Sequence, residues 1–161
     1  MPDRDYTIRP ARAADAEALE AMWLAMSRQH AGYDPERWNW AEDIGEKWRA
    51  HFLEIVDKPE TVCLVAAVGD SRLIGYVMAA ITEPAPVWAT RRRGQVYDLF
   101  VADEHRRRGV GKKLMQAAFD ELKARGAEDV ILRVSKDNLP AVKHYESVGM
   151  RIVVYEMYKR L

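Results

Sequence analysis

The spacing of apolar residues in the first third of the chain predicts two helices. One apolar stripe runs from Leu19 to Met26 and a second from Ile44 to Val56, both at helical intervals. A short strand from Tyr6 to Arg9 is expected before them. Pro59 ends the second helix because proline cannot continue an α-helix. The pattern therefore places two helices between a first strand and the rest of the sheet.

The middle of the chain shows the pattern of strands. Residues 62–68 form a continuous apolar run, a Gly-Asp-Ser turn follows, and residues 73–82 are again apolar and β-branched. Two such runs joined by a tight turn predict an antiparallel pair. A third extended run covers residues 95–102 and carries Asp98 inside it. The proline- and arginine-rich residues 83–94 before it are expected to form a loop.

The last third returns to alternating helices and strands. Residues 112–125 form an amphipathic helix, 129–134 a strand, 140–148 a helix, and 150–161 a last strand or hairpin arm. The expected fold is α/β (α+β), with a mixed, mostly antiparallel central sheet of about six to seven strands flanked by about four helices.

Composition narrows the class of protein. A chain of 161 residues with 48% hydrophobic residues is the size of one domain, so residues 1–161 are expected to form a single domain. Lys plus Arg (25) balance Asp plus Glu (25), which argues against a nucleic acid or an anionic membrane as partner. Cys63 is the only cysteine, and His30 and His51 lack metal-ligand spacing, so no metal is expected. No run of 18 apolar residues occurs, and a cytoplasmic location is expected.

The segment Arg106-Arg107-Arg108-Gly109-Val110-Gly111-Lys112 joins a strand to a helix. The first amides of a helix have no carbonyl partners and carry a partial positive charge, so they bind anions. Two glycines remove the Cβ atoms that would keep a diphosphate away from those amides. The magnesium-binding hydroxyl of a Walker A loop and the third glycine of a Rossmann loop are both missing.

The pattern Arg106-x-x-Gly109-x-Gly111 resembles the pyrophosphate-binding signature of the GCN5-related N-acetyltransferase (GNAT) superfamily. The downstream block Asn138-x-x-Ala141-x-x-x-Tyr145-x-x-x-Gly149-Met150 and the opening Ile8-Arg9-Pro10-Ala11 are also similar to conserved blocks of that family. The resemblance covers essentially the whole chain. It implies a GNAT-like sheet and acetyl-CoA as the acetyl donor substrate.

The resemblance also implies roles for individual residues. Residues that would bind the coenzyme are Leu99, Phe100 and Val101 for the pantetheine, and Arg106, Arg107, Arg108, Gly109, Val110, Gly111 and Lys112 for the pyrophosphate. The Val101 N–H would also hold the oxyanion formed during attack on the thioester. Tyr145 matches the general acid that returns a proton to the departing thiolate. Asn138 would cap the last helix or bind the pantetheine, and the two roles are compatible.

The sequence does not identify the general base. Some family members carry a glutamate on the fourth strand, and Tyr97 stands where that glutamate would align. Alternation points Asp98 to the opposite face of the sheet, which favours a structural role for its carboxylate. Ordered water, Glu83 or His30 are the other candidates for the base.

The acceptor would lie against the first two helices and the loop before the fourth strand. Aromatic walls with nearby carboxylates could hold a cationic amine there, although the acids are more typical of a solvated helix face. The residues are Met26, His30, Tyr33, Trp38, Trp40, Trp48 and Trp88 with the acids Glu36, Glu42, Asp43 and Glu46. Trp48 is expected in the core, because it lies on the apolar stripe of the second helix.

Three functions are compatible with these observations. The first is acetyl transfer to the primary amine of a small molecule, with a homodimer possible. The second is acetylation of protein N-termini or lysines. The third is a coenzyme A sensor without turnover.

Overall fold

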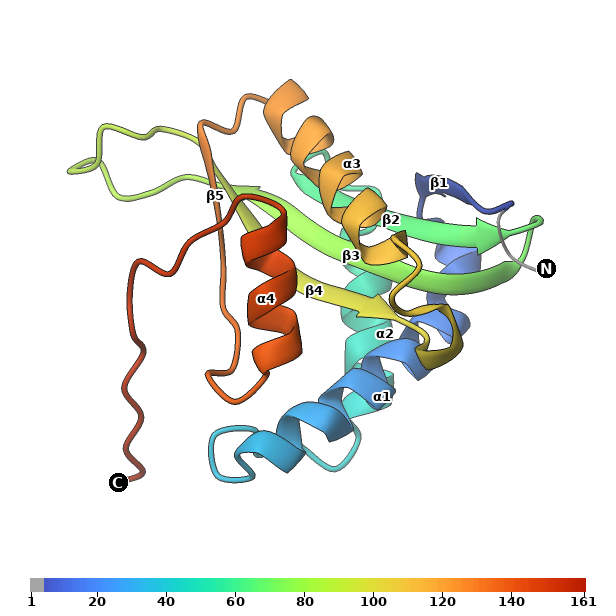
Figure 1. The fold of residues 1–161 in the computed structure, drawn as a ribbon, viewed down its shortest axis with the longest axis horizontal. Coiled ribbons are helices and arrows are strands. Elements are labelled where there is room, and N and C mark those ends of the chain that lie inside the picture. Colours follow the sequence, from blue (N-terminus) through green and yellow to red (C-terminus); the bar gives the residue numbers. More distant parts are fainter. Residues whose placement is uncertain (1–4) are drawn as a thin grey trace.

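The structure, a computed structural model, describes residues 5–161. The strands in this part of the chain are β1 (Thr7–Pro10), β2 (Thr61–Val68), β3 (Arg72–Thr82), β4 (Arg93–Val101) and β5 (Asp129–Leu132). They form one sheet in the order β1-β2-β3-β4-β5 (Figure 1). Neighbours from β1 to β4 are antiparallel, and β5 lies parallel to β4. The expected mixed, mostly antiparallel sheet is confirmed.

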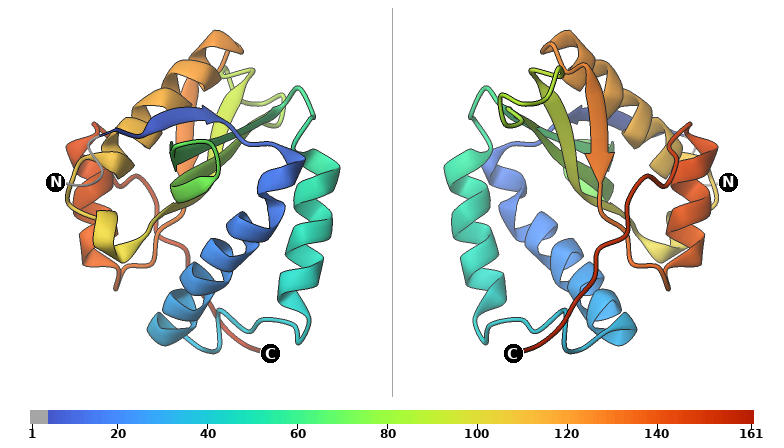
Figure 2. Two further views of the ribbon diagram at one scale, coloured as in Figure 1. Left: turned by 90° about the vertical axis from the view of Figure 1, so that its right-hand side faces the viewer. Right: turned by 90° about the vertical axis from the view of Figure 1, so that its left-hand side faces the viewer.

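Helices cover both faces of this sheet. They are α1 (Ala16–Tyr33), α2 (Ile44–Ile55), α3 (Val110–Ala124) and α4 (Leu139–Ser147). Figure 2 shows α1 and α2 on one side of the sheet, with α3 and α4 on the other. Each described helix is too short or too polar to cross a membrane.

Two apolar layers hold the helices to the sheet. On one face, α3 buries Leu114, Ala118 and Leu122 against β2, β3 and β4. On the other face, Leu19 of α1 and Phe52 of α2 are fully buried. These residues recur at helical spacing, so each helix presents one apolar stripe to the sheet. Burial of such stripes is the main stabilisation of the fold.

The expected strand over residues 150–161 is wrong. The residues from 150 onward form no helix or strand, and the sheet therefore has five strands in the described chain instead of six to seven. Figure 1 shows this segment leaving α4 and running along the side of the molecule to the C terminus. A β-prone sequence forms a strand only where the edge of another strand lies about 4.8 Å away. The segment lies outside the sheet, so its residues do not pair with a strand of this chain within the described residues.

A bulge interrupts β4 at Tyr97. Met78 of β3 pairs with Asp98, whereas the next β3 residue, Ala79, pairs with Val96. Tyr97 is therefore the extra residue of β4 and pairs with no residue of β3. A bulge of this kind redirects side chains and increases local twist. Because of the extra residue, the side chains of β4 after Tyr97 point to the opposite face from the one that strict alternation predicts.

β4 and β5 pair at one end and separate at the other, which we call the closed and the open end. Its parallel register runs from Arg93↔Asp129 to Val96↔Leu132 and stops there, although β4 continues to Val101. Two bonds tie the closed end together, Arg93 Nε to Asp129 Oδ1 at 2.7 Å and Arg93 Nη2 to Asp129 Oδ2 at 2.6 Å. The second half of β4 consequently has no neighbour on its β5 side among the described residues.

Candidate functional site

The loop between β4 and α3 has the backbone geometry of an anion site. Gly109 is the N-cap of α3 and has a φ of +83°, a conformation that L side chains rarely adopt. The first bond of the helix runs from the Lys113 N–H to the Gly109 carbonyl at 3.0 Å. The amides of Val110, Gly111 and Lys112 therefore lie ahead of the helical ladder, where the helix dipole favours negative charge.

Gly111 of the loop packs closely against His144 of α4. A Cβ added at Gly111 would lie 3.3 Å from His144 Cε1 and 3.6 Å from Val101 Cγ2, so only glycine leaves this space free. His144 Nε2 is buried and has no hydrogen-bond partner among the described residues. A buried polar atom without a partner is unfavourable unless a ligand satisfies it. His144 Nε2 is therefore a polar group that a ligand beside the loop could satisfy.

The three arginines of the loop are exposed but not equivalent. Arg106 donates from Nε to the Val101 carbonyl at 2.8 Å and forms an ion pair with Asp103 at 2.8 Å. It therefore ties the loop to the end of β4 and adds positive charge there. Arg107 has a positive φ of 58°, and Arg107 and Arg108 lead directly into Gly109. Lys112 adds a further exposed cation in the first turn of α3.

The residues predicted to bind pantetheine lie on the open half of β4. Leu99 and Val101 pack against the α3 face, whereas Phe100 packs against the α1 and α2 face. The unpaired side of this half-strand leaves backbone N–H and C=O groups for an added strand or an extended ligand. The structure thus brings Leu99, Phe100 and Val101 next to the glycine loop.

Asn138 and Tyr145 lie at the two ends of α4. Asn138 is the N-cap of α4, and its Oδ1 accepts a bond from the Ala141 N–H at 3.3 Å. Tyr145 packs against the α3 face of the core. Burial, with a smaller contribution from the charge of Asp98, raises the pKa of Tyr145 to about 12. The phenol is therefore protonated at neutral pH, as a proton donor must be.

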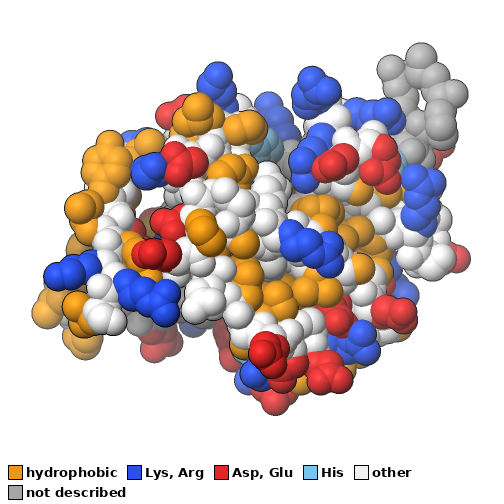
Figure 3. All heavy atoms as spheres, turned by 90° about the horizontal axis from the view of Figure 1, so that it is seen from below, with side chains coloured by type: hydrophobic (Ala, Val, Ile, Leu, Met, Phe, Trp, Pro, Cys, Tyr) orange, Lys and Arg blue, Asp and Glu red, His pale blue; other side chains and the backbone are white. Residues whose placement is uncertain are grey.

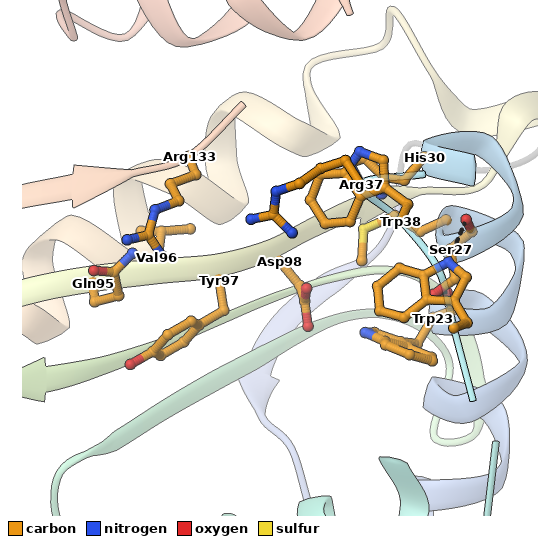
Figure 4. Close-up of a pocket in the computed structure, with 12 residues that line it drawn as sticks. Trp23, Ser27, His30, Arg37, Trp38, Gln95, Val96, Tyr97, Asp98 and Arg133 are labelled. Carbon is orange, nitrogen blue, oxygen red and sulfur yellow. Dashed lines mark hydrogen bonds between the residues drawn. The ribbon is translucent and has the colours of Figure 1, made fainter. Parts of the chain in front are cut away.

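A pocket of about 190 Å³ lies between α1 and the bulged part of β4. Figure 4 shows the side chains around it. Trp40 contacts both Trp23, with ring centroids 5.3 Å apart, and Trp38, at 5.7 Å, so the three rings form a continuous aromatic wall. The lining residues are Trp23, Met26, Ser27, His30, Arg37, Trp38, Trp40, Gln95, Val96, Tyr97, Asp98 and Arg133.

The expectation that Asp98 points away from the face of Tyr97 is wrong. The bulge at Tyr97 breaks the strict alternation of β4, and both side chains line the same pocket. In Figure 4, Asp98 lies between Tyr97 and Trp23. Burial raises the pKa of Asp98 to about 7, because the carboxylate has lost its water, while the Tyr76 hydroxyl opposes the shift. A carboxyl group with this pKa can take up a proton near neutral pH.

Two arginines lie at the mouth of the pocket and meet one carboxylate of the C-terminal segment. Arg37 Nη2 is 2.8 Å from Glu156 Oε1, and Arg133 Nε is 3.0 Å from Glu156 Oε2. The neighbouring arginines lower the pKa of Glu156. These contacts are exposed, so their contribution to stability is small. They nevertheless place residue 156 beside the pocket.

Only part of the expected acceptor region reaches the pocket. Met26, His30, Trp38 and Trp40 line it. Trp48 is buried in the core as expected, where it stacks on Trp23. The expected residues that do not line the pocket are Tyr33, Trp88, Glu36, Glu42, Asp43, Glu46 and the base candidate Glu83.

Several site residues escaped the sequence analysis. Arg37 and Arg133 come from segments far apart in the chain, so no spacing links them. Trp23 was visible only as a member of an apolar helical stripe. His144 directly precedes Tyr145, and its place beside Gly111 depends on how α4 packs against the loop.

Known proteins resemble this chain in sequence and fold. Residues 18–150 match the profile of the acetyltransferase (GNAT) family. The chain is 30% identical over 142 residues to a mycothiol acetyltransferase from Corynebacterium aurimucosum, covering 84% of this chain and 44% of that protein. An N-alpha-acetyltransferase from Sulfurisphaera tokodaii is 27% identical over 156 residues, which cover 93% of this chain and 83% of that protein.

The fold likeness extends over the whole chain. The aminoglycoside acetyltransferase AAC(6')-Iy, solved with a bisubstrate analogue of coenzyme A and acetylneamine, aligns with a TM-score of 0.76 at 18% identity. The alignment covers 98% of each chain. By contrast, the chain spans less than half the length of the mycothiol acetyltransferases that it matches.

Proposed function

The chain belongs to the acetyltransferase (GNAT) family, and on this premise we propose that it transfers an acetyl group from acetyl-CoA to the primary amine of a small molecule. The observation that carries the proposal is the position of Asp98. Its buried carboxylate lies in an aromatic pocket beside the open half of β4. In this proposal the proton acceptor, the amine site and the coenzyme site lie next to one another along β4.

The coenzyme is held by the loop and by β4. Backbone amides of Val110, Gly111 and Lys112, with the side chains of Arg106, Arg107 and Arg108, bind the pyrophosphate. Gly109 gives the turn its left-handed conformation. The unpaired backbone of Leu99, Phe100 and Val101 binds the pantetheine, and His144 Nε2 and Asn138 offer further polar contacts. No metal is needed for this transfer.

The chain's own groups move two protons. When bound, acetyl-CoA supplies the thioester that the amine attacks and from which coenzyme A leaves as a thiolate. The Asp98 carboxylate accepts the proton that the amine gives up, directly or through one water. The Val101 N–H donates a hydrogen bond to the carbonyl oxygen as negative charge develops on it. The Tyr145 hydroxyl, which its raised pKa keeps protonated at neutral pH, donates its proton to the departing sulfur.

The aromatic wall suits a cationic or amphipathic amine. Tryptophan faces attract ammonium groups, and burial in an aromatic pocket helps an amine to lose its proton. The pocket is small, at about 190 Å³, and its floor carries an acid while its mouth carries two arginines. This combination supports a compact polar amine over a long peptide.

Acetylation of protein N-termini is the second candidate, because three relatives are N-alpha-acetyltransferases. A peptide needs an open groove that admits its backbone on both sides of the amine. The small volume of the pocket between α1 and β4, about 190 Å³, supports the small molecule. Lysine acetylation requires the same kind of open access.

A thiol-release assay with acetyl-CoA tests the proposal. Small primary amines, peptides with free N-termini and lysine-containing peptides form its three panels, and Asp98→Asn serves as the matched variant. We expect release with small amines that is lost in the variant. Release with peptides alone, or coenzyme binding measured by calorimetry without any release, would contradict the proposal and favour the peptide enzyme or the sensor.

A further inference from the structure

Two arginines at the mouth of the pocket come from separate elements and converge on one point. Arg37 follows α1, and Arg133 comes directly after β5, where β5 separates from β4. Both line the pocket that contains Asp98. In Figure 4 both side chains lie above Tyr97 and Asp98 in the view, and Figure 3 shows the molecule from below with Lys and Arg in blue. Two cations that share one site repel each other unless an anion lies between them.

A carboxylate already occupies the point between the two arginines. Glu156 Oε1 accepts from Arg37 Nη2 at 2.8 Å and from Arg37 Nε at 3.3 Å, and Glu156 Oε2 lies 3.0 Å from Arg133 Nε. Each guanidinium therefore contacts one oxygen of the same carboxylate. The arginines lower the pKa of Glu156, because they favour its ionised form. This point thus has the geometry and the charge to bind a carboxylate.

Arg37 is positioned by the turn that contains it. The Arg37 N–H donates to Asp34 Oδ1 at 3.0 Å, and the Trp38 N–H donates to the Asp34 carbonyl at 3.0 Å. The Arg37 guanidinium lies over the Trp38 ring, 5.0 Å from its centroid. An arginine stacked on an aromatic ring loses less conformational freedom when it binds an anion. Arg37 is therefore pre-organised at the mouth of the pocket.

The contact with Glu156 can give way to a ligand. The Glu156 side chain is 49% exposed, and the side chains of Arg37 and Arg133 are 37% and 77% exposed. Exposed ion pairs contribute little to stability, because water solvates both partners. Glu156 belongs to neither core layer, so its release leaves the core packing intact. A carboxylate on a molecule that also binds elsewhere in the pocket gains from both contacts at once.

We propose that Arg37 and Arg133 bind a carboxylate of the acceptor, and that the acceptor is therefore a small amino carboxylate. The inference rests on the proposed function, in which Asp98 receives the proton of the amine. Among the described residues that line the pocket, Asp98 is the one acid, whereas both arginines lie at the mouth. The amine end of the acceptor lies near Asp98, the carboxylate end meets the arginines, and the aromatic wall packs against the carbon chain between them.

Matched acceptors test the arginine site in the thiol-release assay. Each member of a series of ω-amino carboxylates of increasing chain length is compared with its primary amide, which has a similar shape and no negative charge. We expect kcat/KM of the native enzyme to be about tenfold higher for the carboxylate at the best chain length. Arg37→Gln and Arg133→Gln should each reduce this preference, and the double variant should abolish it. Arg28→Gln is the control and should keep the preference, because Arg28 is an exposed residue of α1 that does not line the pocket.

Glu156→Gln tests whether Glu156 competes with the acceptor for the arginines. The neutral side chain holds the guanidinium groups less strongly, so the preference for the carboxylate over the amide should rise about threefold. A preference that falls in this variant would show that Glu156 supports the site instead of competing for it, and would contradict the displacement.

Binding without turnover separates this inference from the proposed function. Titrations of tryptophan fluorescence in the presence of coenzyme A measure the binding of carboxylates and amides directly, since Trp38 lies beside Arg37. Equal kcat/KM for carboxylates and amides, or a preference that survives in the double variant, would overturn the inference and leave acetyl transfer to small amines in place. Carboxylate binding that depends on both arginines, with no thiol release from any amine, would contradict the proposed function and with it the role of the carboxylate as part of an acceptor.

Discussion

The two halves of β4 differ in what surrounds them, although they belong to one strand. The first half, from Arg93 to Val96, is paired on both sides and locked to β5 by the Arg93–Asp129 ion pair. The second half, from Tyr97 to Val101, starts with a bulge and has no partner on the β5 side in the described chain. Pairing in the first half stabilises the sheet. The missing pairing in the second half leaves space and backbone groups for ligands.

Asp98→Asn, in the second half of β4, should lower turnover more than the other substitutions. The amide cannot accept a proton, and we expect the turnover number to fall about 10³-fold. In the native enzyme kcat/KM should rise through pH 7, because the Asp98 carboxylate forms as its pKa of about 7 is passed. The variant should lack this rise. A pH profile of thiol release measures both, and a rise that persists in Asp98→Asn would exclude this residue as the base.

Asp98→Asn should also change how the free energy of unfolding depends on pH. The pKa of Asp98 is raised in the folded state, so the folded chain binds a proton that the unfolded chain has released between about pH 4 and pH 7. The free energy of unfolding should therefore decrease as pH rises through this window. Urea unfolding of Asp98→Asn should show less of this decrease. Equal slopes in both proteins would indicate that Asp98 is not buried as described.

Tyr145→Phe should lower turnover about 10²-fold and leave coenzyme binding unchanged, because only the proton donor is lost. Calorimetric titration with coenzyme A and the thiol-release assay measure the two effects separately. Tyr33→Phe is the control, since Tyr33 does not line the pocket. Full activity in Tyr145→Phe would remove this phenol from the mechanism.

Gly111→Ala should weaken coenzyme A binding about tenfold, which corresponds to about 1.4 kcal/mol. The added methyl would lie 3.3 Å from His144 Cε1 and would narrow the space above the helix amides. Gly32→Ala is the matched control, because a Cβ at Gly32 meets nothing within 4 Å. Equal dissociation constants for the two variants would contradict the coenzyme site.

Arg93→Ala, at the closed half, should have the smallest effect. The ion pair with Asp129 is partly exposed, and we expect a loss of about 0.5–1 kcal/mol in the free energy of unfolding without a change in turnover. Arg93 lowers the pKa of Asp129, so this stabilisation should be present above about pH 4 and disappear as the carboxylate is protonated. Urea unfolding at two pH values measures it. A large loss of turnover would show that the two halves are not functionally separate.

Local patterns predicted the helices well and placed a glycine turn at the start of α3. The helix expected over residues 112–125 is observed as Val110–Ala124, because its apolar stripe and flanking glycines lie within one short segment. Gly109 and Gly111 were recognisable for the same reason, since a helix start and a glycine turn are contiguous in sequence. The alternation of β4, in contrast, misplaced Asp98, because the bulge arises from register with β3.

The sequence alone determined the order of the elements from β1 to α4, the glycine turn before α3 and the family likeness, because each depends on residues close together in the chain or on their types. The tertiary structure decided which residues share the pocket, the raised pKa of Asp98 and the fate of residues 150–161. These features depend on strand register, burial and the presence of a free edge. Such quantities arise only when distant segments meet, so the pattern of a single segment cannot specify them.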